Sequence, residues 1–276
     1  MDANAAVAAL DARATRQPTP AGAGAMVWRA WGEGRPLVLL HGAAGSWTHW
    51  LRNISALAGR FRVLAADLPG FGDSDTPPEP HTADLLARLV SAGLDRLVPP
   101  PAPLDLAGFS MGGIVAGLVA ARQGARVGTL VLVGPNGMAL PYATHRLRRV
   151  RPGMTPGETR ETHRENLRIL MLADPAAADD LAVHLQMDNV RRARFKSAGI
   201  PESDALLRAL PAVRARIAGI WGARDAFAAP YLDDRRRTLA RFQPGLEFCI
   251  IEGAGHWVLY EAADRVNAVL LALLGR

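Results

Sequence analysis

Short apolar runs recur along the chain and alternate with longer stretches whose apolar positions follow a helical period. The runs predict strands at Ala25–Trp31, Pro36–Leu40, Phe61–Ala66, Leu104–Phe109, Thr129–Val133, Ile217–Trp221 and Leu246–Ile251. Helices are predicted over Trp47–Ala58, Ala83–Leu97, Met111–Gln123, Pro230–Phe242 and Glu261–Leu274. Runs that are apolar on both faces and alternate with helices indicate an α/β fold with a mostly parallel sheet between helices. Ala25–Trp31 is expected to be an antiparallel edge strand.

The alternation stops between residues 138 and 211, where amphipathic helices such as Pro156–Leu172 and Ala176–Ser197 are predicted without a strand. At the other end, residues 1–16 are rich in alanine and predict a helix packed loosely on the outside. The prolines and glycines of residues 17–24 predict a linker. The expected organisation is therefore an extension and linker (1–24), an α/β core (25–137 and 212–276) and a helical insertion (138–211).

Composition favours a single globular domain with an insertion, since 276 residues can bury a large core. The net charge of +6 comes from arginine, because Lys196 is the only lysine, and no aromatic-interleaved basic stripe predicts nucleic-acid binding. Cys249 has no partner for a disulfide within the chain. No run reaches the roughly 18 apolar residues of a membrane span, and residues 1–4 lack the basic start of a signal peptide. We expect a cytoplasmic protein without nucleic-acid or membrane partners, either monomeric or homodimeric.

A candidate nucleophile, Ser110, lies in Gly108-Phe109-Ser110-Met111-Gly112, between a predicted strand and a small-residue helix. A sharp strand-to-helix turn lifts such a serine clear of the sheet, and the glycines avoid clashes that Cβ atoms would cause. A serine nucleophile needs a base, and the base needs an acid. Asp225 and His256 each follow a predicted strand, and sites form at the carboxyl ends of parallel strands. These three residues are the candidate catalytic triad.

The motifs together resemble those of the α/β-hydrolases. They are Leu40-His-Gly-Ala-Ala-Gly-Ser46, Asp67-Leu-Pro-Gly-Phe-Gly-Asp-Ser74, the serine pentapeptide, Trp221-Gly-Ala-Arg-Asp225 and Gly253-Ala-Gly-His256, in the family's order. The resemblance extends from about Met26 to the C-terminus and implies that the insertion 138–211 caps the site. It implies roles for Ser110 as nucleophile, Asp225 as acid and His256 as base. The oxyanion would be bound by the backbone N–H groups of Ala43 and Met111.

Other polar residues have structural interpretations. His41 is expected to form hydrogen bonds beside the glycine turn, and Asp67 and Asp73 to brace the turn between them. The remaining histidines have no partner at metal-ligand spacing, so no metal is predicted; they are His49, His81, His145, His163 and His184. The basic cluster Arg146–Arg151 is expected to be a solvated surface, because acidic residues nearly balance the charge of the insertion.

The resemblance implies a cofactor-free serine hydrolase that forms an acyl-enzyme from a small ester, thioester or lactone. Ala44, Phe109 and Trp257 are the candidate pocket residues. Interception of the same acyl-enzyme by peroxide, a perhydrolase side activity, stays open. A further alternative is a non-catalytic ligand receptor on the same fold.

A large aromatic residue beside the base, here Trp257, resembles a feature of the carbon–carbon hydrolases. Those enzymes cleave ring-fission dienols, the meta-cleavage products. Those relatives carry a substrate-binding arginine in the cap, for which Arg191, Arg192 and Arg194 are candidates here. They also carry asparagine before the nucleophile, where this chain has Phe109. Ester hydrolysis is therefore preferred and carbon–carbon cleavage is the alternative.

Overall fold

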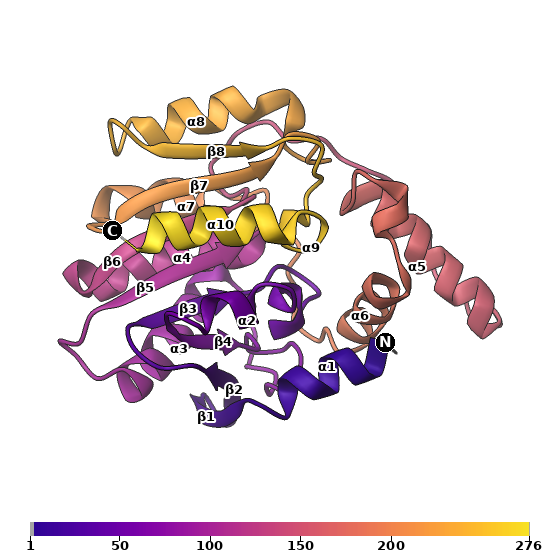
Figure 1. The fold of residues 1–276 in the computed structure, drawn as a ribbon, viewed down its shortest axis with the longest axis horizontal. Helices are drawn as coiled ribbons and strands as arrows, with labels where there is room; N and C mark the ends of the chain where they lie inside the picture. Colours follow the sequence, from indigo (N-terminus) through magenta and orange to yellow (C-terminus); the bar gives the residue numbers. More distant parts are fainter. Residues whose placement is uncertain (1–2, 276) are drawn as a thin grey trace.

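The computed structural model describes residues 3–275, within which eight strands form one sheet in the order β1-β2-β4-β3-β5-β6-β7-β8 (Figure 1). The strands are β1 (Thr15–Ala21), β2 (Gly24–Trp31), β3 (Pro36–Leu40), β4 (Arg62–Ala66), β5 (Leu104–Phe109), β6 (Val127–Val133), β7 (Arg216–Gly222) and β8 (Glu247–Ile251). β2 is antiparallel to both of its neighbours, and the pairs from β4 to β8 are parallel. The predicted α/β class with a mostly parallel sheet is confirmed.

Helices cover both faces of the sheet. The elements α3 (Ala83–Leu97), α4 (Met111–Gln123), α7 (Ala205–Ala209) and α8 (Leu232–Ala240) pack into one core, and α1 (Ala3–Asp11), α2 (Ile54–Leu57), α9 (Val258–Glu261) and α10 (Ala263–Leu274) into the other. Successive residues of a strand enter opposite cores, as Val38 and Leu39 do. No helix within residues 3–275 is both long enough and apolar enough to cross a bilayer.

The edge of the sheet differs from the prediction. The expected linker 17–24 contains most of β1, which pairs with β2 along its whole length, so the linker prediction is wrong. Pro18 and Pro20 make the segment resemble a loop, yet an edge strand tolerates prolines at positions that would not donate to the neighbouring strand. Ala25–Trp31 is antiparallel as predicted, but it is an internal strand and not the edge.

The N-terminal helix is shorter and better anchored than expected. It ends at Asp11, whose carboxylate pairs with the buried guanidinium of Arg29 at 2.6 Å. Leu10 is buried, and its carbonyl accepts the indole N–H of Trp31 at 2.9 Å. The helix therefore packs firmly against β2; Met1 and Asp2 lie outside the described residues.

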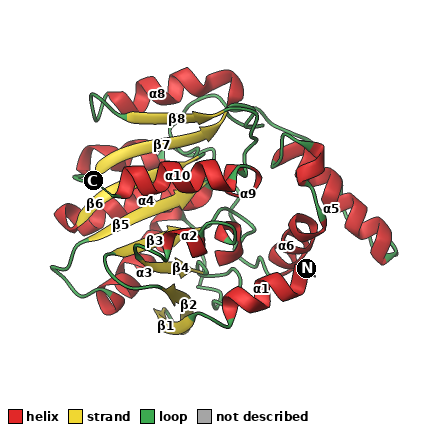
Figure 2. Cartoon of the chain, in the orientation of Figure 1, coloured by secondary structure: helices red, strands yellow, loops and turns green. Residues whose placement is uncertain are grey.

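The helical insertion follows β6. Figure 2 shows a long loop running from the sheet to α5 (Pro156–Leu170), which is followed by α6 (Asp180–Arg191). In Figure 1 these two helices lie on the side toward which β7 and β8 point. The segment after α6 is tied to the loop after β4, since the N–H groups of Arg194 and Phe195 donate to the Gly70 carbonyl at 2.8 and 3.1 Å. The later helix α7 packs on α4 instead.

Candidate active site

Ser110 stands at a tight turn between β5 and α4. Its backbone has φ 52° and ψ −120°, a left-handed conformation that is rare for residues other than glycine. A Cβ at Gly108 would overlap the carbonyl of Gly112, and a Cβ at Gly112 would overlap the carbonyls of Leu40 and His41. The two glycines thus allow β5, α4 and the end of β3 to approach closely, with the Ser110 side chain partly exposed.

The three candidate triad residues are brought together. Ser110 Oγ lies 3.0 Å from His256 Nε2, and His256 Nδ1 lies 2.8 Å from Asp225 Oδ2. The other carboxylate oxygen of Asp225 accepts the N–H groups of Phe227 and Ala228 at 2.9 and 3.2 Å. Because an ionised carboxylate accepts the Nδ1 hydrogen, the hydrogen-bond network assigns a lone pair to Nε2, directed at the serine hydroxyl.

A glycine at the end of β7 positions the acid and the base. A Cβ at Gly222 would overlap the carbonyl oxygens of Ala254 and Gly255. The end of β7 therefore touches the loop after β8, which places Asp225 beside His256. Both side chains are buried, so their mutual hydrogen bond is shielded from water.

Two backbone N–H groups beside Ser110 are free to bind an anion. Neither Ala43 nor Met111 donates its N–H to any other residue within 3–275. Met111 is the first residue of α4, where helix N–H groups are unpaired and the helix dipole is positive. A Cβ at Gly42 would lie 3.2 Å from the Cβ of Ser110, so the loop that carries Ala43 rests against the serine turn. The pair can act chemically as an oxyanion hole.

His49 holds this loop in place, a role that the sequence analysis missed. Its Nδ1 accepts the N–H of Gly42 at 3.2 Å, and its ring packs against Phe109 and Trp257. Burial lowers the pKa of His49 well below its usual value, and the nearby His41 and His256 lower it further. The only sequence sign of this contact is Gly45, where a Cβ would overlap the His49 ring.

Asn189 of α6 joins the insertion to the same loop. Its Oδ1 accepts the hydroxyl of Ser46 at 2.7 Å and that of Thr48 at 3.3 Å, and its Nδ2 donates to Thr48 Oγ1 at 3.1 Å. All three side chains are buried. The insertion is therefore hydrogen-bonded to the segment that leads from Ala43 to His49.

The candidate pocket residues behave differently from the expectation. Phe109 and Trp257 are 1% and 0% exposed, so both rings are buried. Trp257 donates its indole N–H to the His49 carbonyl at 3.0 Å and stacks on Tyr260. The two rings therefore pack in the core next to the site and do not form a pocket wall. Ala44, in contrast, is partly exposed.

A cavity of about 170 Å³ lies beside His256, between the insertion and the loops after β7 and β8. Its lining is aliphatic and basic, formed by Arg168, Ile169, Leu170, Leu172, Ala173, Arg224, Ala226, Gly255 and His256. Most of the aliphatic lining residues belong to the end of α5 and the loop after it. The surface that the cavity exposes is mostly polar, so it can receive a small polar group next to the candidate base.

The structural interpretations of His41, Asp67 and Asp73 are confirmed. His41 Nε2 accepts the N–H of Leu68 at 2.9 Å, and its Nδ1 bonds to the Gly42 carbonyl. Asp67 accepts the N–H of Asp73 at 2.9 Å and forms an ion pair with the buried Arg29 at 3.0 Å. Asp73 also pairs with Arg29. These groups brace the turn after β4 and do not touch Ser110.

The three candidate cap arginines are engaged away from Ser110. Arg191 pairs with Asp188 at 2.5 Å, and Arg192 pairs with Asp188 and Asp73. Arg194 donates to Thr76 and to carbonyl groups of the loop after β4. None of them forms a hydrogen bond with Ser110 or His256.

The chain is similar to known proteins along most of its length. The model of the alpha/beta hydrolase family matches residues 37–269. The dihydrolipoyllysine-residue acetyltransferase component of an acetoin cleaving system from Pseudomonas putida is 32% identical over 249 residues, covering 87% of this chain but only 64% of that protein. A 2-hydroxy-6-oxononadienedioate/2-hydroxy-6-oxononatrienedioate hydrolase from Escherichia coli (strain K12) is 31% identical over 260 residues, 87% of each chain.

Among solved structures, carboxylesterase CesB from Bacillus subtilis superposes with a TM-score of 0.78 at 19% identity, covering 99% of this chain and 95% of that chain. At this identity the likeness supports the fold alone. The family match spans most of the sheet and the insertion, including Ser110, Asp225 and His256. The chain therefore belongs to the alpha/beta hydrolase family.

Proposed function

We propose that this chain is a serine hydrolase that cleaves a small ester, thioester or lactone through an acyl-enzyme, without a cofactor. The observation that carries the proposal is the line of hydrogen bonds from Ser110 Oγ through His256 to Asp225, at 3.0 and 2.8 Å. The free N–H groups of Ala43 and Met111 beside the serine support it.

In this mechanism Ser110 Oγ attacks the substrate carbonyl while His256 Nε2 takes the hydroxyl proton. The buried Asp225 carboxylate stabilises the resulting imidazolium. The carbonyl oxygen becomes an oxyanion bound by the Ala43 and Met111 N–H groups, and His256 then protonates the leaving alcohol or thiol. Water attacks the acyl-serine in a second cycle of the same steps and regenerates the enzyme.

We further propose that the insertion, residues 138–211, acts as a cap that sets substrate choice. The supporting observations are the cavity beside His256, lined by Ile169, Leu170 and Leu172, and the bonds of Asn189 to the loop after β3. In this proposal the cavity beside His256 takes a small acyl or leaving group, and the insertion keeps bulk water from the acyl-serine.

Carbon–carbon cleavage of ring-fission dienols is the second candidate, because the hydrolase from Escherichia coli is 31% identical along most of both chains. Such a reaction needs a fixed cation for the substrate carboxylate, a role suited to arginine. Arg191, Arg192 and Arg194 are engaged elsewhere. Arg168 and Arg224 line the cavity beside His256 and are the remaining candidates for this cation. Ester hydrolysis requires no such cation and is preferred.

The nucleophile is tested with a fluorophosphonate probe. We expect the probe to label the native protein and to fail on Ser110→Ala, while Ser197→Ala, a matched serine on the insertion, labels normally. Circular dichroism of each variant checks folding. Equal labelling of the native protein and Ser110→Ala would overturn the assignment of Ser110, and no labelling of the native protein would favour a non-catalytic receptor.

The reaction is tested with p-nitrophenyl esters of graded acyl length and a vinylogous 1,5-diketone acid. We expect measurable ester hydrolysis and little turnover of the diketone acid. If that acid is cleaved at least about tenfold more efficiently than the best ester, a gap of roughly 1.4 kcal/mol in transition-state binding, carbon–carbon cleavage is the function.

A further inference from the structure

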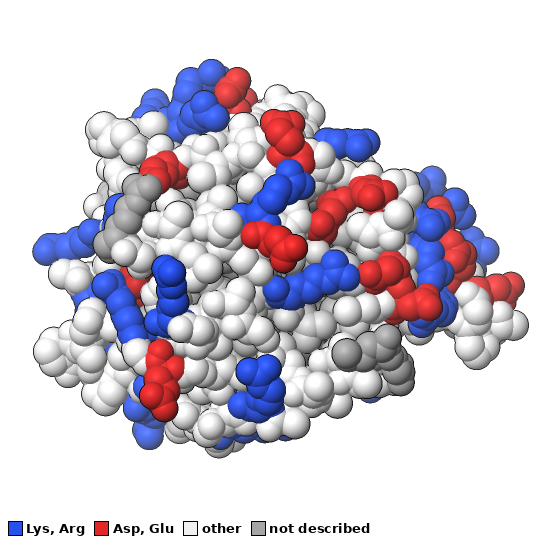
Figure 3. All heavy atoms as spheres, in the orientation of Figure 1, with Lys and Arg blue, Asp and Glu red and all other residues white. Residues whose placement is uncertain are grey.

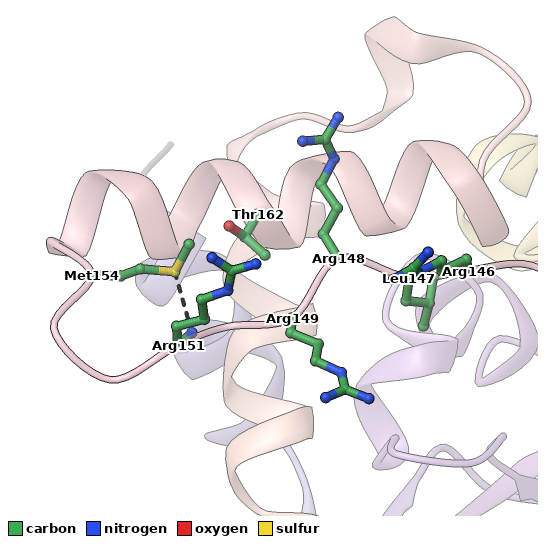
Figure 4. Close-up of a pocket in the computed structure, with 7 residues that line it drawn as sticks. All are labelled: Arg146, Leu147, Arg148, Arg149, Arg151, Met154 and Thr162. Atoms are coloured by element: carbon green, nitrogen blue, oxygen red, sulfur yellow. Dashed lines mark hydrogen bonds between the residues drawn. The ribbon is translucent and has the colours of Figure 1, made fainter.

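A second hollow lies on the insertion, apart from the cavity beside His256. It has a volume of about 670 Å³ and lies between the extended segment Arg146–Arg151 and α5 (Figure 4). Its lining is Arg146, Leu147, Arg148, Arg149, Arg151, Met154 and Thr162. Four of these seven side chains are arginines, and none is acidic. The proposed hydrolase mechanism uses none of them.

Three of the four guanidinium groups of this hollow lack protein partners within residues 3–275. Within residues 3–275, those of Arg146, Arg149 and Arg151 form no hydrogen bond or ion pair, and Arg148 approaches Glu165 at 3.8 Å. Figure 3 shows acidic and basic side chains side by side at the α5 end of the molecule, and Arg168 of α5 indeed pairs with Glu165 at 2.8 Å. The lining itself contains four arginines and no acidic residue, and only Arg148 has an acidic partner, so the hollow carries an excess of positive charge.

The segment that carries these arginines is held against α5. Asn166 of α5 accepts the N–H of Arg148 at 2.8 Å and donates its side-chain amide to the Arg148 carbonyl at 2.9 Å. Arg151 donates its N–H to the sulfur of Met154 at 3.3 Å. Asn166 therefore fixes the backbone of the segment to α5 at Arg148, although the charges that the segment carries repel one another.

We propose that this hollow binds a ligand carrying two or more phosphate groups. Guanidinium groups match phosphate oxygens in charge and in hydrogen-bond geometry. In Figure 4 the Arg148 and Arg149 side chains project to opposite sides of the segment, and Arg151 turns toward α5. Charges spread in this way suit several separated phosphates better than one. Thr162 adds a hydroxyl to the lining.

The phosphate groups can belong to a free polyphosphorylated molecule or to the headgroups of an anionic lipid surface. Leu147 and Val150 are 43% and 46% exposed and alternate with the arginines, so a lipid would also cover apolar surface. The binding does not require the chemistry proposed for Ser110, and Ser110→Ala is expected to bind the same ligand equally well.

The test measures calorimetric binding of tripolyphosphate to the full chain. We expect the double variant Arg149→Gln/Arg151→Gln to bind at least about tenfold more weakly than the native protein, because each charge-assisted contact contributes strongly. The matched control is Arg160→Gln/Arg208→Gln, which removes the same charge from two arginines already paired with Asp180 and Asp204. The control should keep native affinity.

Co-sedimentation with vesicles of phosphatidylglycerol, and of phosphatidylcholine as a neutral reference, identifies the source. Binding of tripolyphosphate alone assigns a free ligand, and binding of phosphatidylglycerol alone assigns lipid headgroups, provided that the Arg149/Arg151 variant loses it. Equal loss in both double variants would mean a general charge effect and overturn the proposal. Failure of both probes to bind the native protein at about 0.15 M salt would overturn it as well.

Discussion

His49 and Gly42 are joined by a hydrogen bond in which the backbone N–H of Gly42 donates to His49 Nδ1 at 3.2 Å. The next residue along the chain, Ala43, carries one of the two free N–H groups beside Ser110. His49 must be neutral to accept this bond, and its burial favours the neutral form. The geometry of the candidate oxyanion site therefore depends on an imidazole that does not touch the serine.

Removal of this acceptor should weaken both stability and activity. In His49→Ala the buried Gly42 N–H loses its partner, which destabilises the fold by about 1–3 kcal/mol, and the loop that carries Ala43 loosens. His49→Gln keeps an acceptor and should lose less of both. Urea unfolding and kcat for the best ester measure the two effects. If His49→Ala is fully active, the bond does not position the loop.

Acid should destabilise the protein below neutrality. Burial lowers the pKa of His41 and of His49 from the usual value of 6.5. Since the unfolded imidazoles bind protons first, the stability that is present above pH 6.5 is lost as the pH falls from 6.5 toward the lowered folded values. Urea midpoints measured from about pH 7.5 to 5.5 should fall for the native protein and fall less for His49→Gln. An unchanged slope in that variant would contradict the assignment.

The base and the acid should differ in their importance. His256→Ala removes the proton acceptor of Ser110 and should lower kcat by about 10³-fold or more. Asp225→Asn should also be severe, because the amide disturbs the imidazole tautomer, although its effect can be smaller. Steady-state kinetics on one ester compares them. Near-native activity of Asp225→Asn would require another acid.

Shortening of the aliphatic cavity lining should change substrate preference. Leu170→Ala enlarges the space beside His256, so we expect the preferred acyl chain to become longer. Leu147→Ala is the control, because this leucine is exposed on the same insertion and does not line that cavity. The ratio of kcat/KM between short and long esters measures the change in acyl-chain preference. A loss of stability with an unchanged ratio would mean that Leu170 only holds the insertion together.

Arg29 should be far more important for stability than its neighbour Arg16. Arg29 is 2% exposed and binds Asp67, itself 1% exposed, so Arg29→Met leaves a buried carboxylate unpaired and should cost about 3–5 kcal/mol. Arg16 is 53% exposed, and Arg16→Met should cost about 0–1 kcal/mol. Chemical denaturation of the two variants provides the comparison. Similar losses would contradict the role of the buried pair.

The elements with strong local signals were predictable from the sequence. Strand β5 and helices α3 and α4 have the predicted bounds, because continuous apolar runs, small helical residues and flanking glycines act over short distances. The predicted helix Trp47–Ala58 is instead a short 3₁₀ helix at Trp47–Trp50 followed by α2. Here long-range contacts, including the bonds of Thr48 to Asn189, override the local helical pattern.

The order of the candidate triad was also predictable, since Ser110, Asp225 and His256 each follow a strand. The surroundings of the site were not. Whether Trp257 faces a cavity or the core depends on the position of His49, which is distant in sequence. The partners of Arg192 are set by Asp73 across the fold. Side-chain direction at such positions follows from tertiary packing, which no local pattern encodes.

The bonds between Gly70 and the segment after α6 bear on attempts to transplant the insertion between relatives. The Gly70 carbonyl receives two N–H groups from that segment, and a Cβ at Gly70 would lie 2.8 Å from the Cβ of Phe195. An insertion taken from a relative would have to form the same contacts with Gly70. A core that receives the present insertion would have to offer the same contacts to Phe195. Chimeras should therefore exchange the loop after β4 together with the insertion, because the two segments pack against each other and depend on each other's sequence.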